Sequence, residues 1–100
     1  MAKVIWSPSA DEDARIIAEY IARDSPQQAS LFATRLFKAA DDLGLFPQMG
    51  RMIPEVGKPD FREIILRPYR LMYHIEGDHV HITGVIHGVR DWKPPTEEWQ

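Results

Sequence analysis

The sequence has 100 residues, 44% of them hydrophobic, which fits one domain over residues 1–100 with a single core. It contains no cysteine, which excludes disulfide bonds, thiol nucleophiles and cysteine-based metal sites. Its net charge of −3 argues against a protein whose whole surface binds nucleic acid.

A short opening strand followed by two helices is predicted in the first half. The apolar run at residues 3–6 is predicted to be the strand. Ser7-Pro8 and Ser25-Pro26 each pair a favoured N-cap with a favoured first helical residue. Apolar residues then recur at helical spacing: Ala10, Ala14, Ile17, Ala18 and Ile21 in the first helix, and Ala29, Phe32, Ala33, Leu36, Ala40 and Leu43 in the second. The short connection between them predicts an antiparallel hairpin.

A long loop is predicted between the helices and the later strands. Pro47 disfavours helix in the residue before it, so we expect the second helix to end between Gly44 and Phe46. Residues 48–59 hold two glycines and two prolines and are predicted to form one loop. Its length suggests a role beyond connection.

Three strands are predicted in the second half. Residues 61–67 and 69–75 are rich in β-branched, aromatic and long apolar side chains, and Pro68 marks a turn between them. Gly77-Asp78 predicts a tight turn into the last strand. Alternation then predicts buried side chains at Leu71, Tyr73, Ile75, Val80, Ile82, Gly84 and Ile86, and outward ones at Arg70, Met72, His74, His79, His81, Thr83, Val85 and His87.

The predicted fold is therefore α+β: an N-terminal strand, an antiparallel helical hairpin, then a three-stranded antiparallel sheet packed on the hairpin. The other face of the sheet is expected to be exposed. Arg70, His74, His81 and His87 are expected to line it.

Arginines on these strands are the first candidates for binding a target. Arg62, Arg67 and Arg70 offer planar forks of donors that suit carboxylates and phosphates. The alternative is that they are ordinary solvated charges, two of them paired with Glu63 and Asp60. Arg70 is the strongest candidate, because an outward arginine in an apolar strand has no acidic neighbour in sequence.

The histidines and the tail leave alternatives open. The four histidines lack the converging cysteine or acidic partners of a metal site, so we expect no metal and no cofactor. His87 is either a general base or a solvated histidine at a strand end. Trp92 and Trp99 stand in a polar tail, where they either pack back on the domain or form part of a partner surface.

Taken in order, several segments resemble the RelE/ParE toxins of type II toxin–antitoxin modules. The resemblance covers nearly the whole chain. Its segments are Trp6-Ser7-Pro8-Ser9-Ala10, Leu45-Phe46-Pro47, Gly50-Arg51, Pro54-Glu55, Arg62-Glu63-Ile64, Tyr69-Arg70-Leu71-Met72-Tyr73 and Val85-Ile86-His87-Gly88-Val89-Arg90-Asp91.

The family has two branches, and the resemblance implies a different activity for each. RelE-like members are ribosome-dependent mRNA endoribonucleases, and in that branch Arg70, His87 and Arg90 would be catalytic. The glutamate at position 63 and the absence of a tyrosine from the tail depart from that pattern. ParE-like members inhibit DNA gyrase by binding it, and the long helical hairpin and mildly acidic balance are nearer to this branch.

The resemblance also implies partners. We expect a growth-inhibiting toxin, of a kind associated with plasmid stabilisation, that a cognate antitoxin neutralises in a hetero-oligomer. DNA gyrase is the expected target, and the ribosome with its mRNA is the alternative. Arg62, Arg67, Arg70, Trp92 and Trp99 are the expected target- or antitoxin-binding residues. No membrane-length apolar run and no signal peptide are visible, so the expected location is cytoplasmic.

Overall fold

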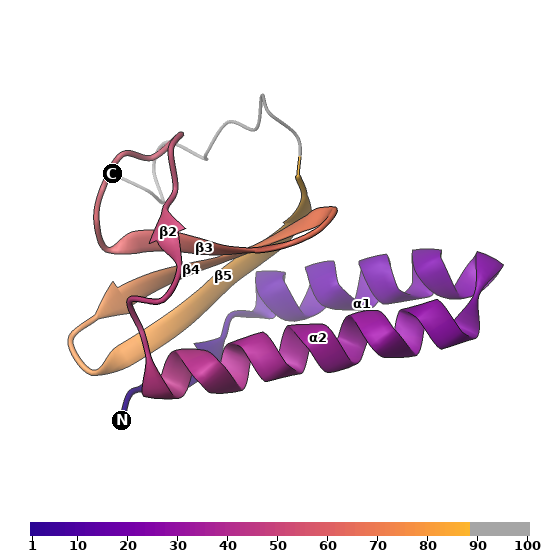
Figure 1. The fold of residues 1–100 in the computed structure, drawn as a ribbon, viewed down its shortest axis with the longest axis horizontal. Coiled ribbons are helices and arrows are strands. Elements are labelled where there is room, and N and C mark those ends of the chain that lie inside the picture. The colour runs from indigo at the N-terminus through magenta and orange to yellow at the C-terminus, as the bar shows by residue number, and fades with distance from the viewer. Residues whose placement is uncertain (89–100) are drawn as a thin grey trace.

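In the computed structural model, which describes residues 1–88, one five-stranded sheet carries two helices on one of its faces (Figure 1). The elements are β1 (Lys3–Trp6), α1 (Pro8–Asp24), α2 (Pro26–Leu45), β2 (Arg51–Met52), β3 (Phe61–Leu66), β4 (Tyr69–Glu76) and β5 (His79–His87). The strand order is β1-β5-β4-β3-β2, with β1 parallel to β5 and the other pairs antiparallel. The predicted α+β arrangement is confirmed, but the sheet is wider than the three strands expected, because β1 and β2 add to its edges.

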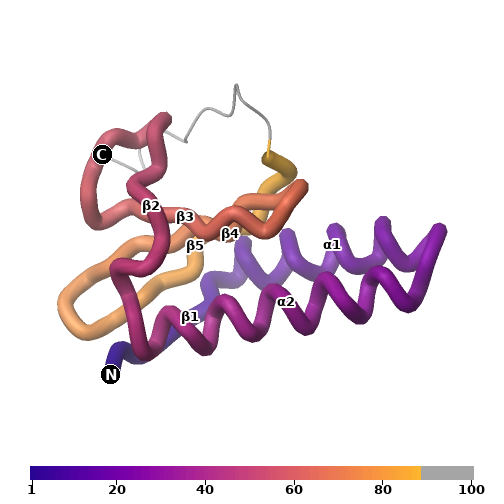
Figure 2. Tube along the Cα trace, viewed as in Figure 1, coloured from indigo at the N-terminus to yellow at the C-terminus, as the bar shows by residue number. Residues whose placement is uncertain are grey.

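The helical hairpin begins and ends where its capping residues predict. The Ser7 side chain accepts a hydrogen bond from the backbone N–H of Ala10 at 3.0 Å, and Ser25 accepts one from Gln28 at 3.1 Å. Figure 2 shows the two helices running antiparallel, with the N-terminus beside the end of α2. There the N–H of Ala2 donates to the carbonyl of Gly44 at 2.8 Å, which ties β1 to the hairpin.

The main core lies between the hairpin and the sheet. Its buried members come from both helices and from β4 and β5: Ala10, Phe32, Leu36, Ala39, Ala40, Leu43, Leu71, Tyr73, Val80, Ile82 and Val85. The apolar stripes predicted on the helices therefore face the sheet. Neither of the helices within residues 1–88 is long and apolar enough to cross a membrane.

A β-bulge reverses the side-chain alternation in the second half of β5. Met72 pairs with Gly84 but Tyr73 pairs with Ile82, so one extra residue lies between the two pairs. Beyond this point Val85 joins the main core and Ile86 packs on the opposite face. The predicted orientations of these two residues are therefore wrong, because strict alternation across the strand cannot include an inserted residue.

The loop between α2 and β3 covers part of the face of the sheet that lies away from the hairpin (Figure 1). Ile53 and Met72 are buried there in a second, smaller core, packed against Val56, Phe61 and Ile86. The prediction that this far face is wholly exposed is therefore wrong. The reason is that the loop carries apolar side chains of its own, which find partners on β4.

Tyr73 anchors the start of this loop from the main core. Its hydroxyl donates to the carbonyl of Pro47 at 2.7 Å and accepts from the N–H of Gly50 at 3.0 Å. Burial raises the pKa of Tyr73, so the hydroxyl keeps its proton and can donate. A Cβ at Gly50 would lie 2.5 Å from the carbonyl oxygen of Glu63, so only glycine lets the loop approach the sheet this closely.

Candidate functional site

The register of β3 against β4 places an acidic and a basic side chain together on the far face. Ile65 pairs with Arg70 and Glu63 pairs with Met72, so Glu63 and Arg70 are diagonal neighbours on one face. The Arg70 Nε donates to Glu63 Oε1 at 2.6 Å. Both residues are buried, with exposures of 5% for Arg70 and 1% for Glu63. Buried ionised groups are retained in proteins when they are paired in this way.

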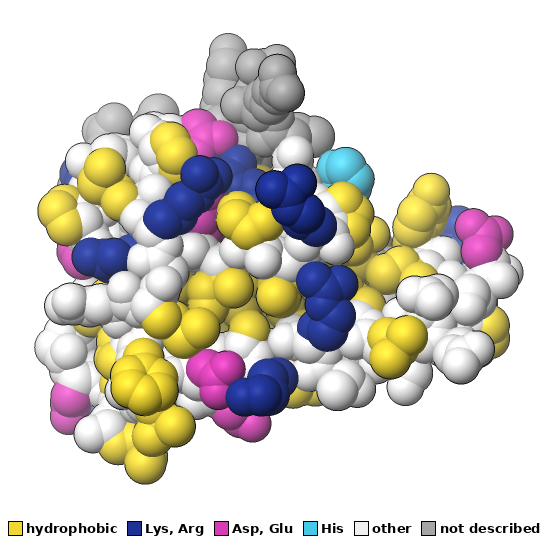
Figure 3. Space-filling view, in the orientation of Figure 1, with side chains coloured by type: hydrophobic (Ala, Val, Ile, Leu, Met, Phe, Trp, Pro, Cys, Tyr) yellow, Lys and Arg dark blue, Asp and Glu magenta, His cyan; other side chains and the backbone are white. Residues whose placement is uncertain are grey.

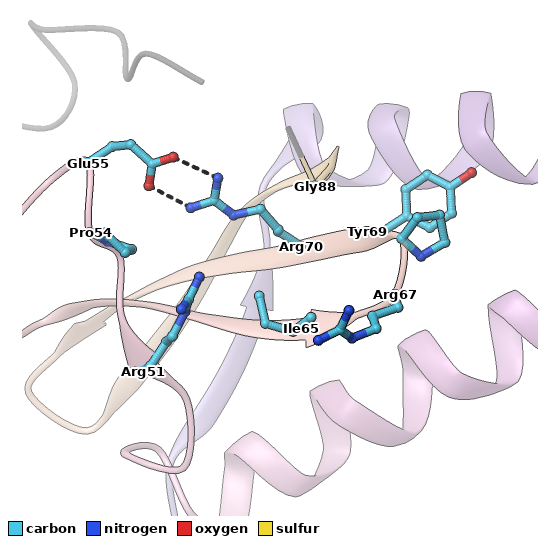
Figure 4. A pocket seen from close by; sticks show the side chains of 9 residues that line it. Arg51, Pro54, Glu55, Ile65, Arg67, Tyr69, Arg70 and Gly88 are labelled. Atoms are coloured by element: carbon cyan, nitrogen blue, oxygen red, sulfur yellow. Dashed lines mark hydrogen bonds and ion pairs between the residues drawn. The ribbon is translucent and has the colours of Figure 1, made fainter. Parts of the chain in front are cut away.

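The loop and β2 complete a network of four charged side chains. Arg70 donates Nη1 to Glu55 Oε2 at 2.8 Å and Nη2 to Glu55 Oε1 at 2.7 Å, as the dashed lines in Figure 4 show. Arg51 donates Nε to the second oxygen of Glu63, Oε2, at 2.6 Å. We call these four residues, Arg51, Glu55, Glu63 and Arg70, the charge network. Its two positive and two negative formal charges cancel.

The contact between Arg70 and Glu55 favours the charged form of both side chains. The hydrogen bonds from Arg70 hold the pKa of the Glu55 carboxyl below its ordinary value, although partial burial opposes this. Hydrogen bonding to Glu55 also raises the pKa of Arg70, against the opposing effect of burial. Arg70 lies on the face of the sheet that strand alternation predicts, but the prediction that it is exposed there is wrong. The carboxylates lie 7 and 15 positions away in sequence, and only the strand pairing and the folded loop bring them into contact.

An open pocket of about 700 Å³ lies beside the network (Figure 4). Its lining combines arginine side chains with apolar ones: Arg51, Pro54, Glu55, Ile65, Arg67, Pro68, Tyr69, Arg70 and Gly88. A smaller hollow of about 290 Å³ lies on the other side of the Arg67–Tyr69 turn, against Phe32 and Leu31 of α2. Figure 3 shows Lys and Arg side chains gathered on the face viewed, with hydrophobic side chains exposed between them.

The structure separates the arginines that the sequence groups together. Arg67 and Arg70 line the same pocket, whereas the Arg62 guanidinium turns under the loop and donates to the carbonyl of Gly50 at 2.8 Å. His87 is exposed and meets the ring of Tyr69 edge-on at 5.6 Å, but it does not line the pocket. The remaining candidates, Arg90, Trp92 and Trp99, lie outside the described residues.

Three of the histidines belong to small contacts of their own. His74 stacks on Phe61 with ring centroids 4.2 Å apart, and its Nε2 lies 3.1 Å from a carboxylate oxygen of Asp60. His79 and His81 stack on each other at 6.0 Å. In the part of the chain that the structure describes, no group of three or more histidine or acidic side chains is arranged to hold a metal ion.

The sequence reasoning missed the acidic half of the site. The carboxylates of Glu55 and Glu63 bind the Arg70 guanidinium and hold it in place. Arg51 binds Glu63, a contact that its place in the Gly50-Arg51 segment does not predict. A signal was present at Glu63. An ionisable residue in a run of apolar strand residues is seldom fully buried unless a partner of opposite charge is available. The alternative of solvated arginines, two of them paired with Glu63 and Asp60, named Glu63 as a partner, but Arg70 and Glu63 are buried rather than solvated.

This fold, with an arginine-centred site on the far face of the sheet, has counterparts among known proteins. A solved structure described as the chromosomal ParDE TA system from P. aeruginosa shares the fold, with a TM-score of 0.70 at 19% identity over 87% of this chain and 96% of the other. The Caulobacter vibrioides protein Toxin RelE2 is 35% identical over 91 residues, covering 90% of this chain and 99% of that protein. The family described as ParE toxin of type II toxin-antitoxin system, parDE, matches residues 4–92. The chain belongs to this ParE toxin family.

Proposed function

We propose that this toxin inhibits DNA gyrase by binding it, without cutting RNA, and that a cognate antitoxin neutralises it. The observation that carries the proposal is that the Arg70 guanidinium is already paired with two carboxylates. It is bound by Glu55 at 2.7 and 2.8 Å and by Glu63 at 2.6 Å. With both carboxylates bound, the Arg70 guanidinium adds no net positive charge for a phosphate.

RNA cleavage places demands on the site that this arrangement meets poorly. The reaction needs a base for the 2′-hydroxyl, an acid for the leaving oxygen and cations that stabilise charge on the phosphorus. Two carboxylates beside Arg70 would repel an incoming phosphate. His87, the candidate base, does not line the pocket. These features favour a protein that acts by binding.

The exposed surface of the hairpin supports a protein partner. Five large apolar residues on the helices have exposures between 51% and 63%: Ile16, Tyr20, Leu31, Phe37 and Leu45. Ile16 and Tyr20 lie about one turn apart on α1, and exposed apolar side chains that adjoin one another mark surfaces that other proteins cover. We assign this surface to a partner protein in a hetero-oligomer, with the antitoxin as the first candidate. The proposal places the toxin in the cytoplasm, where gyrase and the nucleoid are.

RNA cleavage on the ribosome is the second candidate. It is favoured by the 35% identity to the relative named Toxin RelE2, and by the exposed position of His87 at the end of β5. Tyr69 meets His87 edge-on, so this candidate has two titratable side chains at one end of the sheet.

The two candidates predict opposite results in a paired assay. The purified chain is titrated into a gyrase supercoiling reaction and, in parallel, into translating ribosomes with labelled mRNA. We expect supercoiling to be inhibited while the message stays intact. Cuts in the message at codon-defined positions, with unaffected supercoiling, would contradict the proposal and establish the nuclease.

A single exposed histidine sharpens the same test. His87→Ala removes the candidate base, and His79→Ala is its matched control, because it removes a histidine from the other end of the same strand. We expect both variants to inhibit gyrase as the parent does, and both to slow growth when induced without antitoxin. A selective loss of toxicity in His87→Ala would instead support catalysis.

A further inference from the structure

We propose that Glu55 occupies a binding site for a carboxylate, and that an acidic side chain of a partner protein replaces it on Arg70. The site consists of the outer edge of the Arg70 guanidinium together with Arg51 and Arg67 at the pocket. Glu55 is then an internal ligand that keeps the site closed until the partner arrives. This inference deepens the proposed function, because it names the chemistry by which a protein partner is recognised.

The two carboxylates bound to Arg70 are not equivalent. Glu63 projects from the middle of β3, its side chain is 0% exposed, and it also binds Arg51. Glu55 comes from the loop between β2 and β3, and its side chain is 20% exposed at the rim of the pocket. Release of Glu63 would leave a buried charge without solvent. Release of Glu55 only requires a loop side chain to turn into water, so Glu55 is the exchangeable ligand.

Departure of Glu55 leaves a site built for an anion. Arg70 would keep its Nε hydrogen bond to Glu63, and this bond would hold the guanidinium in its present orientation. Nη1 would lose its partner Glu55 and face the pocket, whereas Nη2 would lose Glu55 but keep its ion-pair contact with Glu63. Among residues 1–88, the lining would then contain three arginines, Arg51, Arg67 and Arg70, and no carboxylate. Glu63 below them would offset one of these charges, so the pocket would be net positive.

The geometry identifies a carboxylate as the ligand class. The bidentate contact of Glu55 shows that a carboxylate lies in the plane of the guanidinium with both oxygens bonded. The rest of the lining is apolar at Pro54, Pro68 and the half-exposed side chain of Ile65. Apolar walls beside a cationic fork suit a peptide that carries an acidic residue next to an apolar one, rather than a continuous phosphodiester chain.

The test compares the full chain with Glu55→Ala, using a fluorescent decaglutamate peptide as the probe. While Glu55 occupies the site, an external carboxylate can bind only those molecules whose site is open. The apparent affinity for that carboxylate is therefore the intrinsic affinity multiplied by the open fraction. We therefore expect Glu55→Ala to bind decaglutamate about tenfold more tightly than the parent. Glu76→Ala is the matched control, because it removes the same charge from the far end of β4, where the side chain is 72% exposed. It should bind as the parent does.

A second readout assigns binding to Arg70 itself. The ¹⁵N NMR signal of the Arg70 Nε–H should shift on addition of acetate in Glu55→Ala and stay in place in the parent. Glu55→Gln, which keeps the shape of the side chain, should show a smaller gain in the same direction. If neither variant folds, Glu55 is an essential structural ligand and the proposal is wrong.

Two results would overturn the inference, and a third would remove the gyrase proposal alone. Equal decaglutamate binding by folded Glu55→Ala and the parent would eliminate the carboxylate site alone. A larger gain for a decauridylate RNA than for decaglutamate would assign the pocket to phosphate and would count against both proposals. Failure to inhibit supercoiling, with carboxylate binding as expected, would remove gyrase as the target but keep the site.

Discussion

The two faces of the sheet are stabilised in different ways. On the hairpin face, Leu71, Tyr73 and Val80 pack against the helices in a continuous apolar core. On the far face, a small apolar cluster around Ile53 lies beside the charge network centred on Arg70. Apolar packing is non-directional and tolerates many sequences, whereas a buried ion-pair network works only when every charge has its partner. The open pocket lies on the second face.

This difference shows where the molecule gives up stability for a specific arrangement. Replacement of buried ion pairs by apolar residues of similar volume is often neutral or stabilising. The charge network is therefore poorly explained as a device for stability alone. It is better explained as a way of holding Arg70 at a pocket in a defined orientation, in keeping with a role in recognition.

Removal of the buried carboxylate should damage the far face most. Glu63→Ala leaves the Arg70 guanidinium without its innermost partner and releases Arg51. We expect a loss of about 3–5 kcal/mol in the free energy of unfolding, measured by urea denaturation. Glu63→Leu combined with Arg70→Met replaces the pair by apolar side chains and should recover most of that loss. A double variant as unstable as the single one would show that the network is required for folding.

On the hairpin face, stability should depend on the volume of the buried apolar side chains rather than on charge. Leu43 of α2 is 0% exposed, whereas Leu45 on the same helix is 55% exposed. We expect Leu43→Ala to lower the free energy of unfolding by about 2–4 kcal/mol. Leu45→Ala should change it by less than about 0.5 kcal/mol. Similar losses in the two variants, compared by the same urea titration, would contradict the assigned core.

The smallest effect concerns pH and the exchangeable carboxylate. Hydrogen bonds from Arg70 lower the pKa of Glu55 in the folded chain from its ordinary value of 4.5, with Arg51 adding to the effect. The stability that this carboxylate contributes is thus present above pH 4.5 and is lost as pH falls through the lowered folded pKa. We expect Glu55→Gln to cost about 1 kcal/mol or less at pH 7.

The difference between Glu55→Gln and the parent should shrink steadily from pH 5 to pH 3, when unfolding is followed by urea titration at each pH. Glu76→Gln, which removes a highly exposed carboxylate, serves as the control for the change in net charge. A difference that stays constant over this range would show that the pairing of Glu55 with Arg70 makes no contribution in solution.

Local sequence signals determined the elements of this protein. Ser7 and Ser25 cap the helices at the predicted positions, Pro47 limits the second helix, and Pro68 and Gly77 mark the two strand turns. Capping, proline geometry and turn preference act over a few residues, so they can be recognised without knowledge of the fold. The pattern of these elements then predicted the α+β architecture and the RelE/ParE resemblance.

Tertiary structure alone decided the orientation and partners of the site residues. One inserted residue in β5 exchanged the orientations of Val85 and Ile86. Glu55 is 15 positions from Arg70 in sequence, and the folded loop places the two side chains in contact. Glu63 is 7 positions from Arg70, and strand pairing places these two in contact. Whether an arginine is a free cation or a neutralised one depends on such long-range contacts. No property of the residue or of its sequence neighbours specifies those contacts, because they form only when separate elements pack together.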